Sequence, residues 1–205
     1  MSRELYNNLK ANILGEFKKV SAILENCDLT TPKAFPEPLM IDSGWLLNTD
    51  DKELNSFLKQ HFTGLTKDVI YKIELLNVSN KEEVISSFLK TKENKIEGRS
   101  CSKYNSENIK FFNKESHNIV LYVGSSKGKS IVTRMRCHMG VGAKKTYGIH
   151  LKTWLPKTQK CNVKITLFEL SYPPGGNQRT NMLELIEQAL WNSEKPLLGK
   201  KSGLL

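Results

Sequence analysis

The sequence predicts a mixed α/β (α+β) fold in which helices flank a small sheet. Segments whose apolar residues recur about every 3.6 positions alternate along the chain with short runs rich in β-branched and aromatic residues. The chain has 205 residues, of which 39% are hydrophobic, and this is enough to bury one sizeable core. Helices and strands mixed in this order are typical of a single core built around a sheet.

The first 62 residues predict a helical N-terminal extension. Apolar residues at helical spacing predict a helix over residues 2–25. Prolines between Asp28 and Pro38 favour a loop, because proline removes a backbone donor. A second helix is predicted from Asp50 to His61, where an aspartate caps the first turn and Gly64 follows the last.

The middle of the chain predicts one strand and one helix. The strand spans Lys67 to Asn77, and its alternation places three residues on one face: Val69, Tyr71 and Ile73. The helix spans Ser79 to Glu93 and opens with a capping-box pattern at Ser79. The segment from Thr91 to Asn118 is polar and irregular, with a short extended piece predicted at Ile109–Phe112.

The second half of the chain begins with the apolar run Ile119–Val123, which predicts a buried strand that Gly124 ends. A helix follows, because apolar residues recur near helical spacing at Ile131, Val132, Met135 and Met139. Gly140 to Gly142 ends it. The remaining predicted elements are a helix at Thr146–Leu155, a strand at Val163–Leu170, a turn at Pro173–Gly176 and a final helix from about Arg179 to Ser193.

The net charge of +10 is distributed unevenly. Residues 1–100 hold 14 Lys and Arg against 15 Asp and Glu, a net −1, whereas residues 101–205 hold 17 against 6, a net +11. A basic half favours a polyanionic partner such as nucleic acid, because phosphates are neutralised by such side chains. A lysine-rich surface without a partner is the alternative that charge alone leaves open.

The sequence further predicts a soluble cytoplasmic protein with no membrane partner. No apolar run approaches the ~20 residues that span a bilayer, and the N-terminus does not follow the pattern of a secretory signal. The four cysteines form no CxxC pair and no cluster at zinc spacing. We therefore expect reduced thiols and no structural metal site.

Three residues are candidates for chemistry. Arg134 and His138 are four positions apart, so they project from one face of the predicted helix, and both are suited to a phosphate. Glu187 has apolar helical neighbours at Leu183, Leu190 and Trp191. A carboxylate in an apolar stripe is costly unless a cation or metal pairs with it. The alternative is that the stripe is tilted and Glu187 lies at its solvated edge.

Gly124 to Ser130 offers a different interpretation, a phosphate-binding loop between a strand and a helix. That loop pattern needs four residues between its glycines, whereas three separate Gly124 from Gly128. The chain also has too few βα units after it for the expected parallel sheet. A nucleotide-binding protein of this kind is therefore the least favoured alternative.

The ordered set Tyr122-Val123-Gly124, Arg134-x-x-x-His138 and Glu187 resembles the GIY-YIG nuclease superfamily. The first family motif would be Val69-Ile70-Tyr71, with Val69 in place of the glycine. On this resemblance, residues 1–62 are the N-terminal extension and residues 63–205 a nuclease domain with an insertion at about 78–117. By spacing alone, Phe111 is the alternative to Tyr71. No asparagine follows Pro196 where many members have one.

The resemblance implies a small, mostly antiparallel sheet and a metal-dependent DNA endonuclease, which could be a restriction-type enzyme. Glu187 would bind one Mg²⁺ or Mn²⁺, and Arg134 would stabilise charge on the phosphate. Tyr71 and Tyr122 would position or deprotonate the water, assisted by His138. A homodimer is one way for such an enzyme to cut both strands.

Basic residues near the motif are candidates for contacts to DNA phosphates: Lys127, Lys129, Arg136, Lys144 and Lys145. The departures at Val69 and after Pro196 motivate an alternative function, a protein on the same fold that binds nucleic acid without cutting it. Such binding would weaken steeply with salt.

Overall fold

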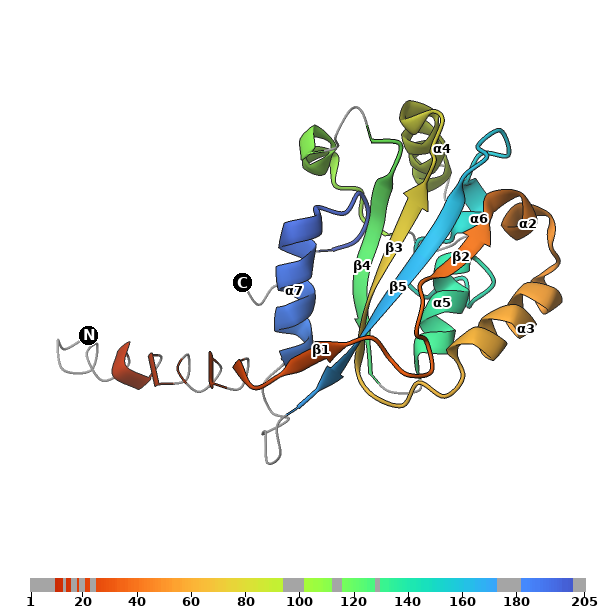
Figure 1. Ribbon diagram of the computed structural model, residues 1–205. Coiled ribbons are helices and arrows are strands. Elements are labelled where there is room, and N and C mark those ends of the chain that lie inside the picture. Colours follow the sequence, from red (N-terminus) through yellow and green to blue (C-terminus); the bar gives the residue numbers. More distant parts are fainter. Residues whose placement is uncertain are drawn as a thin grey trace.

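A computed structural model has an α+β fold, a five-stranded antiparallel sheet flanked by helices, and confirms the predicted fold class (Figure 1). The structure describes residues 10–12, 14–15, 18, 21–22, 25–93, 102–111, 116–127, 130–172 and 182–200, with the backbone alone at Glu93 and Phe111. Most of the predicted helix at 2–25, the predicted turn at 173–176 and the start of the predicted last helix lie outside the described residues.

The central strand of the sheet is β3. The strands are β1 (Asp28–Thr30), β2 (Leu39–Asp42), β3 (Val69–Leu76), β4 (Ile119–Ser126) and β5 (Asn162–Ser171). β3 pairs with β4 on one side and with β5 on the other. The far edge of β5 is shared, because β2 pairs with its first half and β1 with its last residues. β4 is consequently the other edge of the sheet.

The helices flank the sheet and begin at capped residues where the sequence supplies a cap. They are α2 (Ser43–Asn48), α3 (Asp51–Phe62), α4 (Lys81–Glu93), α5 (Ile131–Met139), α6 (Leu151–Trp154) and α7 (Met182–Glu194), with a 3-10 helix, η2, at Ser106–Phe111. The Asp50 side chain accepts a hydrogen bond from the backbone of Glu53, which confirms the predicted cap of α3. In the described part of the chain, no helix combines the length and apolarity needed to cross a membrane.

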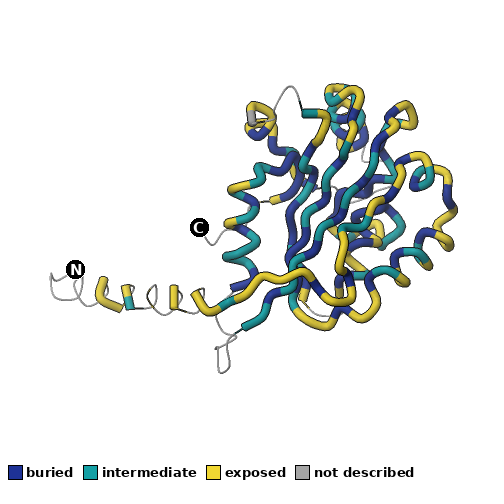
Figure 2. Tube along the Cα trace, viewed as in Figure 1, coloured by how far each residue is buried: buried dark blue, intermediate teal, exposed yellow. Residues whose placement is uncertain are grey.

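The two faces of the sheet carry different helices. On one face, Tyr71 and Ile73 belong to the main core, to which α2 to α6 contribute. On the other face, Ile70 and Leu170 pack against Leu183 of α7. Figure 2 shows the result, with buried residues along the central strands and exposed residues along β1. The alternation predicted for the strand around Tyr71 is therefore confirmed.

The described part of the predicted N-terminal extension contains strands as well as helices. β1 begins in the segment predicted to be a loop, and β2 and α2 follow in a segment with no predicted element. Leu54, Leu58 and Phe62 of α3 are at most 1% exposed and lie in the main core. Residues 28–62 thus add strands to the sheet and apolar side chains to the same core.

Several local predictions are wrong in ways that have a physical reason. Gly124 does not end the strand, since β4 continues to Ser126 by pairing with β3. The piece around Ile109 is a 3-10 helix, not an extended segment. The helix predicted at Thr146–Leu155 is reduced to α6, because His150 has a left-handed backbone (φ 50°) that a helix cannot include.

The start of α4 also differs from the prediction. Asn80, not Ser79, accepts the hydrogen bond from the backbone of Glu83 at 3.0 Å. Ser79 instead donates to the Gln159 side chain at 3.0 Å. The helix itself is confirmed, with Val84 and Phe88 buried.

Candidate active site

Two tyrosines and a histidine meet on the face of the sheet that α5 covers. Tyr71 lies on β3 and Tyr122 on β4, and their rings stack with centroids 6.0 Å apart. The ring centroid of His138, on α5, lies 5.5 Å from that of Tyr71 and 4.5 Å from that of Tyr122. His138 Nε2 is 2.8 Å from Tyr71 Oη. Three of the predicted catalytic residues are therefore in contact.

The hydrogen bonds of His138 define which ring nitrogen carries the proton. The backbone N–H of Ile149 donates to Nδ1 at 3.4 Å, so Nδ1 is the acceptor and Nε2–H donates to Tyr71 Oη. Burial, followed by the charges of Arg134 and His150, lowers the pKa of His138 to about 3. The ring is therefore neutral at neutral pH.

Burial also raises the pKa of both tyrosines. Tyr71 is 1% exposed, and its pKa is raised first by burial and then by the neighbouring Tyr122. For Tyr122, burial and the charge of Glu187 raise the pKa, while Arg134 and a hydrogen bond with Tyr71 act in the opposite direction. Both phenols are consequently neutral in the free protein, and Tyr122 is the less buried of the two.

Gly124 makes room for the two tyrosine rings. It lies opposite Tyr71 in the β3–β4 register. A Cβ at Gly124 would stand 2.5 Å from Tyr122 Cε1 and 2.7 Å from Tyr71 Oη, closer than carbon atoms approach in real structures. Only glycine therefore lets the backbone of β4 approach the phenols this closely.

Glu187 reaches β4 from the opposite face of the sheet. Its Oε2 accepts a hydrogen bond from Ser125 Oγ, which alternation along β4 places on the face covered by α7. Burial raises the pKa of Glu187, whereas the Ser125 hydrogen bond and the charge of Arg134 oppose that rise. Its helical neighbours Leu183 and Trp191 are buried, and Glu187 itself is half-buried at the border of this stripe.

Glu187 supplies a carboxylate, a ligand type that Mg²⁺ prefers. Within the described ranges, no group of three or more His, Cys, Asp or Glu side chains could hold a metal ion. Mg²⁺, however, usually keeps several waters and binds one or two carboxylates together with substrate phosphates. A bound cation would also offset the penalty that burial imposes on the charged form of Glu187. Glu187 would therefore hold one Mg²⁺ or Mn²⁺ only together with waters and substrate phosphates.

The charge of Arg134 acts both on the aromatic cluster and on Glu187. It is an exposed residue of α5, and its positive charge acts on the pKa of four groups: Tyr71, Tyr122, His138 and Glu187. The aromatic cluster lies on one face of β4 and the carboxylate on the other, so the site wraps around the end of this edge strand. The charge of Arg134 therefore reaches both the aromatic cluster and the carboxylate.

The chain that follows α7 covers the beginning of the same edge. The backbone N–H of Leu197 donates to a carbonyl of β4 at 2.9 Å. Gly199, with a φ of 117°, lies against Tyr122, where a Cβ would stand 3.1 Å from the ring. The side chain of Asn108 donates to the Pro196 carbonyl at 2.8 Å. An asparagine from the predicted insertion therefore holds the segment that follows α7.

The other predicted residues are mostly exposed basic side chains. Lys127, Arg136, Lys144 and Lys145 are exposed, and Lys129 lies outside the described residues. Phe111 lies at the end of η2, whereas Tyr71 is on the strand that pairs with β4, so Tyr71 is the residue that the fold brings to Tyr122. Gly124 lies inside a strand and not at the start of a loop, unlike the first glycine of a phosphate-binding loop.

Sequence reasoning missed Ser125 and Ile149, the partners of Glu187 and His138. Ser125 lies beyond the predicted end of the strand at Gly124, and its face follows only from the continuation of β4 to Ser126. Ile149 acts through its backbone and leaves no signal in its side chain. Comparison with protein-family models, curated proteins and solved structures found no match.

Proposed function

We propose that this protein is a metal-dependent DNA endonuclease that hydrolyses phosphodiester bonds. The observation that carries the proposal is the meeting of Tyr71, Tyr122 and His138 beside Arg134 and Glu187 at the end of β4. The excess of positive charge in residues 101–205 supports a polyanionic substrate.

Each side chain has a role that its environment permits. Arg134, exposed and always charged, would stabilise the negative charge that develops on the phosphate. Tyr122, a neutral phenol at the border of solvent, would orient the attacking water by a hydrogen bond. His138 and Tyr71 are more deeply buried and would hold Tyr122 in place. A divalent ion at Glu187 would supply further neutralisation of the phosphate oxygens.

Plasmid cleavage tests this proposal. The wild type, incubated with Mg²⁺ or Mn²⁺, should linearise or nick plasmid DNA, and EDTA should stop the reaction. Glu187→Gln should remain folded and lose cleavage. Discrete fragments would indicate a restriction-type enzyme that recognises a sequence. Plasmid and genomic DNA that stay intact with every divalent metal would refute the proposal.

A second candidate function is nucleic-acid binding without cleavage. The observation that favours it is that Glu187 is already engaged by Ser125, and that the described residues hold no group of three or more potential metal ligands. In that case the wild type would shift DNA in a gel but never cut it, and Glu187→Gln would bind with unchanged affinity. Cleavage by the wild type that disappears in Glu187→Gln would exclude this alternative.

A further inference from the structure

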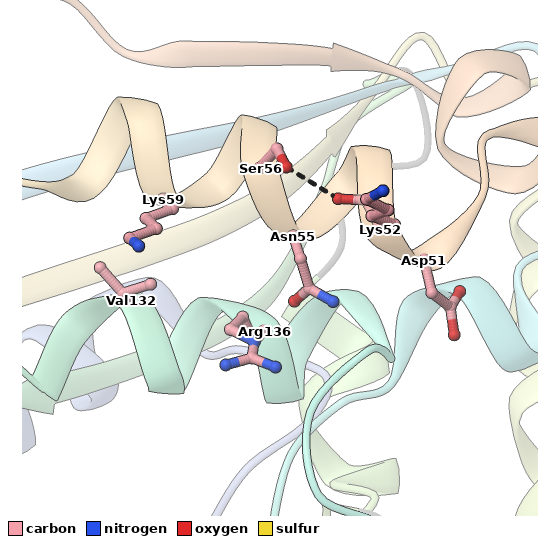
Figure 3. Close-up of a pocket in the computed structure, with 7 residues that line it drawn as sticks. All are labelled: Asp51, Lys52, Asn55, Ser56, Lys59, Val132 and Arg136. Atoms are coloured by element: carbon pink, nitrogen blue, oxygen red, sulfur yellow. Dashed lines mark hydrogen bonds between the residues drawn. The ribbon is translucent and has the colours of Figure 1, made fainter.

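A groove of about 420 Å³ lies between α3 and α5, beside the candidate active site but not part of it (Figure 3). Its lining consists of Asp51, Lys52, Asn55, Ser56, Lys59, Val132 and Arg136. Five of these residues come from α3, which belongs to the predicted N-terminal extension, and two come from α5. The groove therefore lies between the predicted extension and the helix that carries Arg134.

The charge of the groove is positive. Lys52, Lys59 and Arg136 supply three cations. Asp51 is the one acid in the lining, and its carboxylate is neutralised by Lys152, whose Nζ lies 2.7 Å from Oδ1. Among the described residues, none of the three cations forms a salt bridge. Three like charges that form no salt bridge repel one another, so an anion in the groove would be stabilised.

The groove also contains an unsatisfied polar atom. Asn55 projects from α3 toward Arg136 (Figure 3), and within the described structure its buried Oδ1 has no hydrogen-bond partner. Buried polar atoms are normally paired, with protein or with water. An amide beside three cations can hydrogen-bond either a phosphate oxygen or a water that accompanies it.

The position of the groove relative to Arg134 suggests what the anion is. Residues two apart on a helix point about 200° away from each other, so Arg134 and Arg136 lie on opposite flanks of α5. A helix with its side chains is only about 10–12 Å across. A DNA strand carries one phosphate for roughly every 3.4 Å of its axis. A strand whose cleaved phosphate lies at Arg134 therefore carries other phosphates within reach of the groove.

We propose that the α3–α5 groove binds backbone phosphates of the DNA next to the cleaved bond. This inference rests on the proposed nuclease function and gives residues 51–59 a role in it. Lys52, Lys59 and Arg136 contact the phosphates without reading the base sequence. The groove thus contributes affinity, and its contribution is sensitive to salt.

The test measures DNA binding in a background that does not cut. Duplex DNA is titrated with Glu187→Gln and with the same protein carrying Lys52→Ala and Lys59→Ala, at several salt concentrations. The matched control carries Lys92→Ala and Lys157→Ala, which remove two exposed charges elsewhere on the molecule. The groove variant should bind at least tenfold more weakly at low salt. Its slope of log K against log salt should be shallower by about 1.8, or about 0.9 per lost contact.

A third variant, Asn55→Asp, adds one negative charge to the groove with almost no change in shape. It should weaken binding by a similar factor if phosphates occupy the groove. A groove variant that matches the control in affinity and slope, while the parent binds DNA, would overturn this inference alone. A parent that does not bind DNA, together with a wild type that does not cut it, would overturn the nuclease proposal as well.

Discussion

Adding a methyl group at Gly124, beside the two tyrosine rings, should affect both stability and cleavage. Gly124→Ala places a Cβ 2.7 Å from Tyr71 Oη, so the tyrosines or β4 must move. We expect a loss of roughly 1–3 kcal/mol in unfolding free energy, typical of overpacking, and a larger loss of cleavage because Tyr122 is displaced. Urea unfolding and plasmid cleavage measure the two effects.

Gly15→Ala is the control, because nothing lies within 4 Å of its added Cβ. It should leave cleavage unchanged. Equal effects of the two substitutions would show that Gly124 does not form the tyrosine site.

His138 should make stability depend on pH. Its pKa falls from an ordinary value near 6.5 to about 3 on folding, so between these values the unfolded chain binds a proton that the folded protein does not. The wild type should therefore lose up to about 1.4 kcal/mol per pH unit as pH falls from 6.5 toward 4. His138→Gln should remove this part of the slope in thermal melts across that range. A slope that is unchanged in His138→Gln would contradict the neutral, buried histidine.

Ser125 is a positioning residue for Glu187 if the nuclease proposal holds. Ser125→Ala removes the hydrogen bond to Oε2 that orients the carboxylate and opposes the rise of its pKa. Partners of metal ligands typically contribute roughly 10–100-fold in metal affinity or activity. We expect half-maximal cleavage to require correspondingly more Mg²⁺, with a smaller change at saturating metal. Ser126→Ala, whose hydroxyl pairs with Ser130 near α5, should not shift the Mg²⁺ dependence.

At the scale of elements, the periodic segments could be predicted and the short ones could not. The apolar residues recur over at least eight positions in four elements: α3, β3, α5 and β5. The spacing of these residues predicts which side of each element faces the core. β1 and β2 have only three and four residues, and they are strands because they pair with the edge of β5. Likewise, α6 is short because His150 turns the chain, which no local pattern indicates. The partners of the site fall in the same class, since Ile149 contributes only a backbone N–H.

A half-buried charge cluster should fasten α7 to β3. Lys72 Nζ lies 3.3 Å from Glu74 and 3.2 Å from Glu194, and its side chain is 18% exposed. Among the described residues, Lys72→Ala leaves Glu194 without this cation and Glu74 with Lys164 alone, 3.8 Å away, so we expect a loss of roughly 2–4 kcal/mol in unfolding free energy. Lys67→Ala breaks the pair with Glu169 at a lysine that is 55% exposed, and should cost less than about 1 kcal/mol. Urea titrations that give equal losses would contradict the difference in burial.

At the scale of the whole molecule, the extension and the sheet should unfold together. Leu58 of α3 is fully buried in the core that also contains Tyr71 and Met135. Leu58→Ala should lower the unfolding free energy by roughly 2–5 kcal/mol, while Leu29→Ala, at an exposed position of β1, should change it by less than about 0.5 kcal/mol.

Trp45 lies in the extension against Phe57, Trp154 in the main core and Trp191 on α7, so tryptophan fluorescence samples the extension, the core and α7. In urea, fluorescence, circular dichroism and cleavage should share one midpoint, and Leu58→Ala should move all three by the same amount. An early fluorescence change at which cleavage survives would mean that α3 can detach from the sheet. Cleavage would then not require the extension. The prediction that the shared core keeps the α3–α5 groove beside Arg134 would be wrong.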